Sequence, residues 1–173
     1  MKRILAISGS LRQGSSNHAI LTYLGNLVQP DMEYTIYNDL ANIPAFDPGL
    51  DNENPPMPVV SLRQLITEAD GVIICTPEYA FGVPGSLKNM LDWLVSSSTL
   101  VDKPVALITA SLGGEYAHAS LLLTLGALTA KLSDKTNLLI QFVRSKIGAD
   151  GTITDEETIK RLYDVFDLFM KGL

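Results

Sequence analysis

The feature that most constrains this fold is a regular alternation between short apolar runs and longer segments with helical spacing. Five runs are brief, continuous and rich in isoleucine, valine and leucine, and they span Arg3–Ser8, Glu33–Tyr37, Gly71–Thr76, Val105–Ala110 and Asn137–Val143. Runs of this kind are typical of strands that are covered on both faces. Helices are predicted at about Asn17–Val28, Val59–Ala69, Ser86–Val95, Tyr116–Lys131 and Asp155–Lys171. Strict alternation of strand and helix predicts an α/β fold, in which a parallel sheet carries helices on both faces.

The length and pattern of the chain favour one domain over residues 1–173. A chain of this size buries a sufficient core without disulfides or metals. The sequence contains neither an internal repeat nor a linker between domains. The one long irregular segment is the Pro- and Asn-rich stretch Asn42–Pro58, which is either a functional loop or an exposed connection.

Several partner classes and locations are disfavoured by composition. The first apolar run ends at Ser8, so it is too short for the core of a signal peptide, and no stretch approaches the roughly 20 apolar residues of a membrane helix. Cys75 is the only cysteine, which excludes an internal disulfide and a CxxC pair. A net charge of −6 argues against a nucleic-acid partner. We therefore expect a cytoplasmic protein that binds neither nucleic acid nor membrane.

The stretch "SGSLRQGSSN", Ser8–Asn17, joins the first strand to the first helix. Backbone N–H groups at a helix start lack internal partners, and the helix dipole favours an anion there. Glycines at positions 9 and 14 allow close approach of the backbone. Hydroxyl and amide donors and one guanidinium come from Ser10, Arg12, Ser15, Ser16 and Asn17. The stretch predicts a phosphate site, and the alternative is a Ser/Gly turn in which Ser15 or Ser16 merely caps the helix.

Three classes of phosphate-binding protein are excluded because their sequence motifs are missing from these loops. Gly9 and Gly14 have the spacing of a P-loop, but Ser15 stands where the lysine should follow, which excludes an NTPase. The dinucleotide fingerprint GxGxxG is absent from the loop. A phosphotyrosine phosphatase needs arginine six residues after its cysteine, and Cys75 is followed at that distance by Phe81. A phosphate monoester that is bound without being cleaved remains, and FMN fits this description.

The loops after the third and fourth strands belong to the same end of the sheet as the phosphate loop. They are "TPEYAFGVPGSLKNMLDWL", Thr76–Leu94, and "SLGGEY", Ser111–Tyr116. Ligands of open α/β sheets bind beyond the carboxyl ends of the strands. Tyr79 and Phe81 offer aromatic surface, and the adjacent glycines of the second loop would bring bare backbone against a ring. A flavin needs backbone donors near its ring carbonyls, because reduction places negative charge there.

Together, "GSLRQGSSN", "TPEYAFGVPGSLKNMLDWL" and "SLGG" resemble the NADPH-dependent FMN reductase family, which includes chromate and quinone reductases. The resemblance covers nearly the whole chain. It implies a flavodoxin-like, doubly wound, five-stranded parallel sheet of order 2-1-3-4-5, with noncovalently bound FMN and with NADPH or NADH as co-substrate. It also implies that the FMN phosphate is held by Ser10, Arg12, Ser15, Ser16 and Asn17. The flavin ring would be bordered by Pro77, Glu78, Tyr79 and Ala80 on one side and by Ser111, Gly113 and Gly114 on another.

Two positions depart from the family pattern. Many relatives have asparagine where this chain has Ala80, and many have arginine shortly after the paired glycines, where this chain has Glu115, Tyr116 and Ala117. The second departure leaves the preference for NADPH or NADH and the choice of acceptor open.

No side chain is expected to act as a catalytic acid or base. His18 and His118 are the only histidines and are too few for a metal site, so we expect none. Glu78 is expected to be structural and held near the flavin through its backbone, and Cys75 to be a buried, inert thiol. Position and electrostatics would then be the protein's contribution to hydride transfer.

Two helical segments bear on assembly. In Ser86–Val95 the stripe expected to face the sheet is formed by Leu87, Met90, Leu91 and Leu94. Trp93 and Val95 fall outside it. The segment Tyr116–Lys131 is apolar on nearly every face, which is typical of a helix buried all round. We expect a homodimer or homotetramer that covers this helix, and the alternative is that the long irregular loop covers it.

The predicted function is that of an FMN-dependent NAD(P)H oxidoreductase. A hydride would pass from NAD(P)H to FMN, and electrons would then pass to a small acceptor such as a flavin, quinone, azo compound or metal oxyanion. The alternative is a flavodoxin-type electron carrier without NAD(P)H reductase activity of its own. The modest net charge and the glycines of "SLGG" favour an open, reactive flavin face over a carrier.

Overall fold

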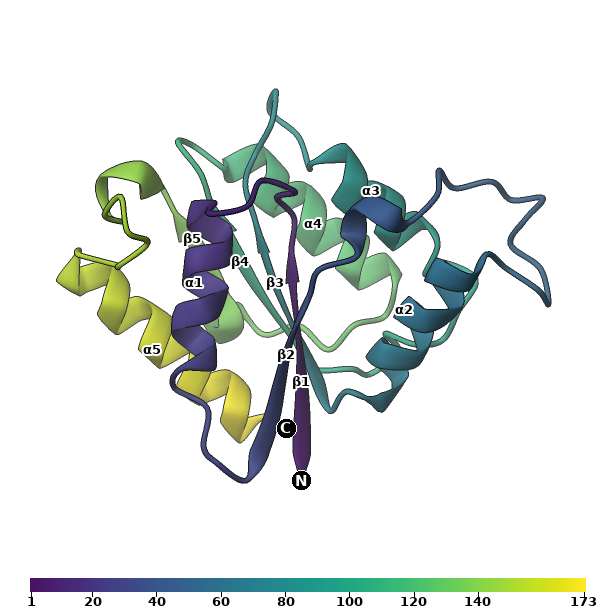
Figure 1. The fold of residues 1–173 in the computed structure, drawn as a ribbon, viewed down its shortest axis with the longest axis horizontal. Coiled ribbons are helices and arrows are strands. Elements are labelled where there is room, and N and C mark those ends of the chain that lie inside the picture. The colour runs from purple at the N-terminus through teal and green to yellow at the C-terminus, as the bar shows by residue number, and fades with distance from the viewer.

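A computed structural model of residues 1–173 contains one five-stranded sheet in which every pairing is parallel. The strands are β1 (Lys2–Ser8), β2 (Met32–Tyr37), β3 (Gly71–Thr76), β4 (Val105–Ala110) and β5 (Asn137–Ile140). Their order across the sheet is β2-β1-β3-β4-β5 (Figure 1). The predicted flavodoxin-like order 2-1-3-4-5 is confirmed.

Five α-helices cover the sheet, and the predicted placement on both faces is confirmed. They are α1 (Ser16–Gly25), α2 (Met57–Glu68), α3 (Gly85–Asp92), α4 (Glu115–Ala127) and α5 (Glu156–Lys171). Figure 1 shows α1 and α5 on one side of the sheet and α2, α3 and α4 on the other. Side chains alternate along β1, so Leu5 and Ile7 enter the core beneath α2 to α4, whereas Ile4 and Ala6 enter the core beneath α1 and α5.

The direction of winding changes next to β1, and this change positions the site. From β1 the chain moves to β2 on one side, then crosses to β3 on the other side and continues outward. Loops on the two sides of this switch point diverge and leave a crevice beyond the carboxyl ends of the strands. The loops that follow β1, β3, β4 and β5 all contribute to this end of the molecule.

The last strand is shorter than predicted, with consequences for the site. β5 ends at Ile140 instead of Val143, because Phe142 adopts a left-handed backbone conformation with φ of 53°. The N–H groups of Phe142 and Val143 then donate to the carbonyls of Leu112 (3.1 Å) and Ser111 (3.0 Å) in the loop after β4. The chain therefore leaves the sheet and lies along the crevice. Helices α1, α3 and α4 also end about one turn earlier than predicted.

Trp93 is buried in the core, although helical spacing placed it outside the apolar stripe of α3. Its indole is fully buried, packs edge-on against Phe46 at 5.1 Å between ring centroids, and donates from Nε1 to the Pro44 carbonyl at 2.8 Å. Asn89 holds the same segment by accepting from the Phe46 N–H (2.7 Å) and donating to the Pro44 carbonyl (2.9 Å). The start of the irregular stretch Asn42–Pro58 is thus a fixed cover over α3, contributed by a segment distant in sequence.

Helix α4 buries only one face within the chain. Ala117, Leu121 and Leu125 face the sheet, whereas Tyr116 and Leu123 point outward with exposed fractions of 62% and 77%. The long irregular loop therefore does not cover this outward face. None of the helices combines the length and hydrophobicity needed to cross a bilayer.

Candidate functional site

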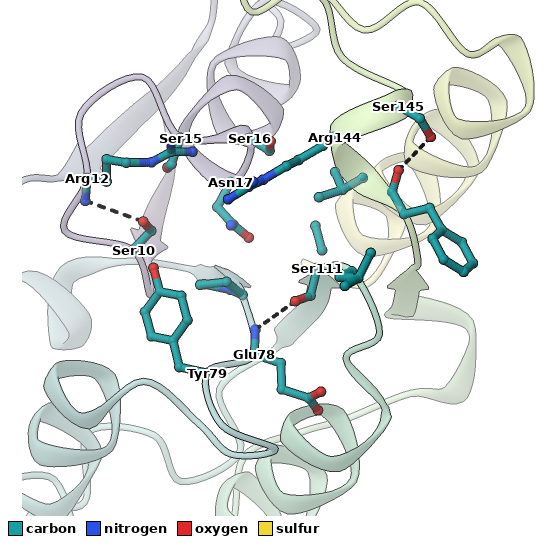
Figure 2. A pocket seen from close by; sticks show the side chains of 15 residues that line it. Ser10, Arg12, Ser15, Ser16, Asn17, Glu78, Tyr79, Ser111, Arg144 and Ser145 are labelled. Atoms are coloured by element: carbon teal, nitrogen blue, oxygen red, sulfur yellow. Dashed lines mark hydrogen bonds between the residues drawn. The ribbon is translucent and has the colours of Figure 1, made fainter.

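A pocket of about 590 Å³ opens at the carboxyl ends of the strands (Figure 2). Most of the predicted site residues line it, namely Ser10, Arg12, Ser15, Ser16, Asn17, Pro77, Glu78, Tyr79 and Ser111. Three others, Ala80, Gly113 and Gly114, lie outside its lining. The fold therefore brings the predicted phosphate loop and the predicted ring-binding loops to one cavity.

The phosphate loop combines a helix cap with a set of donors. The Ser15 hydroxyl accepts the His18 N–H at 3.2 Å and caps α1. The cap suggested as an alternative is therefore real, yet a hydroxyl that accepts still has its own proton to donate. Within the loop, the buried Ser10 hydroxyl accepts the Arg12 N–H at 3.3 Å. Capping and anion binding are compatible roles for the same residues.

The close approach of the phosphate loop to β3 requires glycine at position 9. Its N–H donates to the Cys75 carbonyl at 2.8 Å, so the loop begins as a continuation of the sheet. A Cβ at this position would lie 2.2 Å from the Thr76 hydroxyl oxygen, closer than real side chains approach. Only glycine lets the loop leave β1 this close to the neighbouring strand.

Cys75 and Asn17 form a buried hydrogen bond beneath the phosphate loop. The Cys75 thiol donates to Asn17 Oδ1 at 3.3 Å, and both side chains are buried. Burial raises the pKa of the Cys75 thiol well above its ordinary value, which keeps the sulfur protonated as a donor. Because the amide oxygen of Asn17 faces the thiol, its NH₂ group is left to donate into the pocket.

Glu78 connects two loops of the site through its carboxylate. Its Oε1 accepts the Gly114 N–H at 3.2 Å and its Oε2 accepts the Ala117 N–H at 2.9 Å, while its own N–H donates to Ser111 Oγ at 3.2 Å. These amides belong to the start of α4, where backbone donors lack helical partners and negative charge is favoured. Gly114, with φ of 112°, supplies no capping side chain of its own. The Gly114 N–H is therefore directed at Glu78 and not into the pocket.

A tight hairpin turn forms the rim beside Glu78. Tyr79 and Gly82 exchange two backbone hydrogen bonds of 3.0 Å, and the residues between them, Ala80 and Phe81, have φ of 49° and 59°. Two positive φ values in a two-residue turn are the pattern of type I′, which asparagine and glycine adopt most readily. Phe81 is 75% exposed and packs edge-on against Tyr116 at 5.3 Å, so the rim is aromatic.

Sequence reasoning missed the side of the pocket that follows β5. It is lined by Phe142, Val143, Arg144 and Ser145, with Ala110 and Leu112 from the fourth strand and its loop. Figure 2 shows Arg144 extended from this side toward the start of α1, where Arg12 also lies. Neither Arg12 nor Arg144 forms an ion pair with a carboxylate. An arginine close behind the last strand was the available signal, but the strand was predicted to extend to Val143.

The pocket has the chemistry of a flavin mononucleotide site. Its phosphate-loop end holds two unpaired guanidinium groups, hydroxyl donors and the start of α1, in a chain whose net charge is −6. The lining also includes Tyr79, Leu112 and Phe142, which offer apolar and aromatic surface. A ligand with a phosphate at one end and a planar ring at the other matches both.

Comparisons with known proteins agree with this chemistry. The family model of NADPH-dependent FMN reductases matches residues 2–143. A quinone reductase of Escherichia coli (strain K12) is 33% identical over 167 residues, covering 92% of this chain and 89% of that protein. An NAD(P)H-dependent FMN reductase of Pseudomonas aeruginosa is 31% identical over 179 residues, covering 99% and 96%. The solved structure of the flavoenzyme NAD(P)H:(acceptor) oxidoreductase from Paracoccus denitrificans superposes with a TM-score of 0.85 at 29% identity, covering 99% of this chain and 97% of that one.

These findings confirm the predicted oxidoreductase activity, with FMN as cofactor and NAD(P)H as co-substrate. They favour an enzyme over the alternative of an electron carrier. Because the family model spans most of the chain and relatives above 30% identity cover almost all of it, the chain belongs to the NADPH-dependent FMN reductase family.

Proposed function

We propose that this FMN-dependent NAD(P)H reductase uses quinones as electron acceptors. The observation that carries the proposal is the pocket itself, in which an aromatic and apolar rim adjoins a phosphate loop. Tyr79 and Phe142 line the pocket with exposed fractions of 55% and 61%, and they offer surfaces against which a planar aromatic acceptor can stack. The similarity to a quinone reductase over 92% of the chain supports the same class of acceptor.

The phosphate loop is proposed to hold the phosphate of FMN. Arg12 supplies a positive charge, and the Ser15 hydroxyl donates a hydrogen bond. The Asn17 NH₂ group is a further donor, and it is oriented by the hydrogen bond between the Asn17 amide oxygen and the Cys75 thiol. Ser10 and Ser16 complete this end of the pocket. When bound, FMN supplies the redox chemistry, accepting a hydride from the nicotinamide and releasing electrons to the second substrate.

The remaining wall is proposed to position the flavin ring. Pro77, Glu78, Tyr79 and Ser111 line it. The carboxylate of Glu78 is engaged by two amides of α4, so its contribution is to hold two loops at a fixed separation. Ala80, Gly113 and Gly114 belong to the same two loops and are proposed to shape them. Hydride transfer requires the reacting rings to lie about 3–3.5 Å apart, so this fixed placement is the protein's main contribution.

The assembly is proposed to be a homo-oligomer located in the cytoplasm. The outward face of α4 presents Tyr116 and Leu123, and the exposed Phe81 packs against the first of these. A second copy of the chain would remove this apolar surface from water. A cytoplasmic location is supported by the single cysteine, which is buried and leaves nothing to oxidise to a disulfide.

Anaerobic reduction tests the proposed function. We expect NADPH or NADH to bleach the visible absorption of the FMN-loaded protein within seconds, and a quinone added afterwards to restore it. A flavin that stays oxidised with both nucleotides would contradict reductase activity.

The acceptor is tested by the same measurement with an azo dye or a metal oxyanion in place of the quinone. Tyr79→Ser should raise KM for the quinone more than KM for the nucleotide, because the tyrosine lies on the exposed rim. Faster reoxidation by the dye or the oxyanion than by the quinone would show that the proposed acceptor class is wrong. The proposed NAD(P)H reductase activity would still hold.

A further inference from the structure

We infer that Arg144 is a second phosphate-binding residue, so that two guanidinium groups from segments distant in sequence hold the phosphate of the cofactor. The inference rests on the proposed placement of the FMN phosphate at the loop that contains Arg12. It adds a residue that belongs to none of the three motifs by which the chain resembles its family.

The backbone around Arg144 is held in place by hydrogen bonds on both sides. Before it, Phe142 and Val143 donate to the loop after β4, and Val143 is buried. After it, the Ser145 N–H and hydroxyl both donate to the Phe142 carbonyl, at 3.0 Å and 2.8 Å. The short helical turn Val143–Ser145 therefore has a fixed position at the pocket wall, from which the Arg144 side chain extends.

The direction of the side chain favours the phosphate end of the pocket. Figure 2 shows Arg144 extended toward Ser16 and Asn17, at the start of α1, and away from Glu78 and Tyr79. Arg12, Ser16 and Arg144 also line a second pocket of about 260 Å³, so both arginines stand between the main cavity and this smaller one. This is the end at which a terminal phosphate, and not the flavin ring, is expected.

The charges at this end match a phosphate monoester. No carboxylate pairs with either arginine, although the chain carries 19 acidic residues against 13 lysines and arginines. The only carboxylate in the pocket lining, Glu78, is engaged by amides of α4. A phosphate monoester carries a charge of about −1.5 to −2 at pH 7, which two guanidinium groups can balance. Arginine binds such a group with planar, charge-assisted hydrogen bonds.

Titration of the apoprotein with FMN and with riboflavin, which lacks the phosphate, tests the inference. Flavin fluorescence gives Kd for the wild type, Arg144→Gln, Arg144→Lys, Arg12→Gln and the double glutamine variant. Arg144→Gln should weaken FMN at least about tenfold, the effect of losing one charge-assisted hydrogen bond. It should change Kd for riboflavin less than about twofold. Arg144→Lys should recover part of the loss, because the charge returns without the planar fork.

Lys160→Gln is the matched control, because Lys160 is exposed on α5 and the substitution removes the same charge. It should leave the ratio of the two Kd values unchanged. In the wild type, FMN affinity should rise from pH 5 to 7 as the phosphate loses its second proton near pH 6. This rise should be smaller in Arg144→Gln.

Equal losses for FMN and riboflavin, or no loss for either, would overturn the role of Arg144. A raised KM for NADPH with unchanged FMN affinity would also overturn it, since the arginine would then bind the nucleotide. If Arg12→Gln likewise fails to separate the two flavins, the proposed phosphate site itself is wrong. If Arg12→Gln separates them and Arg144→Gln does not, only the present inference fails.

Discussion

At the scale of single residues, the Glu78 carboxylate has a structural role at the pocket wall, because it joins two loops by hydrogen bonds. Both of its oxygens accept amide hydrogens from the start of α4, and the Glu78 N–H donates to Ser111. The residue thereby links the loop after β3 to the loop after β4. Its position at the pocket wall predicts a flavin contact, and its hydrogen bonds predict a second role in stability.

Glu78→Gln is expected to lower the free energy of unfolding by about 1–3 kcal/mol. The glutamine amide has the same shape, but its NH₂ group would face a backbone N–H of α4 that now donates to a carboxylate oxygen. The substitution should weaken FMN and riboflavin by the same factor, since the change lies far from the phosphate end. Urea unfolding and flavin titration measure the two effects. Glu157→Gln, on the exposed first turn of α5, is the control. An ionisation in the pH–rate profile that disappears in Glu78→Gln would instead indicate acid–base catalysis.

At the scale of elements, the turn between Tyr79 and Gly82 carries backbone strain. Ala80 and Phe81 both adopt positive φ, a region that L-residues other than glycine, asparagine and aspartate occupy at a cost. The asparagine that many relatives have at the first of these positions suits a type I′ turn better than alanine does. Phe81 keeps its place through the contact with Tyr116.

Ala80→Asn is therefore expected to stabilise the protein by about 0.5–1 kcal/mol, because asparagine adopts the left-handed region with less strain. The urea midpoint should rise with an unchanged m value. Ala149→Asn, at an exposed loop alanine without positive φ, should change stability little. A lower urea midpoint for Ala80→Asn would contradict this expectation. It would show that the Ala80 methyl group makes a contact that stabilises the protein more than relief of the backbone strain does.

The elements also show which features were predictable from sequence. Strand and helix order followed from local periodicity, and the phosphate loop followed from donors that are adjacent in the chain. Trp93 was misplaced because the segment that covers it lies more than 40 residues earlier, where periodicity carries no information. Arg144 was missed because β5 ends at a left-handed Phe142, which pairs with the loop after β4. Both failures concern contacts between segments that are distant in sequence.

At the scale of the whole molecule, the outward face of α4 is left uncovered within a single chain. Within one chain the helix buries Ala117, Leu121 and Leu125, and leaves Leu123 exposed. The prediction that this helix is buried all round is thus met only if a second copy lies against it. Trp93 contributes nothing to such an interface, because it is enclosed in the core.

Light scattering at micromolar concentration should give at least twice the chain mass of 18.8 kDa. Leu123→Glu should lower the mass toward that of one chain, since a charge cannot be buried against an apolar partner without a large cost. Val95→Glu places the same charge at an exposed position beyond α3 and should not change the mass. A wild-type protein that is monomeric at this concentration would contradict the proposed assembly.

The burial of Cys75 has a practical consequence for labelling. The only thiol of the chain is fully buried and held by Asn17 in a protonated form, so maleimides and similar reagents find no accessible target on the native surface. A cysteine introduced at any exposed position would then be the sole site of attachment. A fluorophore or spin label attached to a cysteine introduced on the Phe81 turn would report ligand entry from one defined position, and the native Cys75 could stay in place.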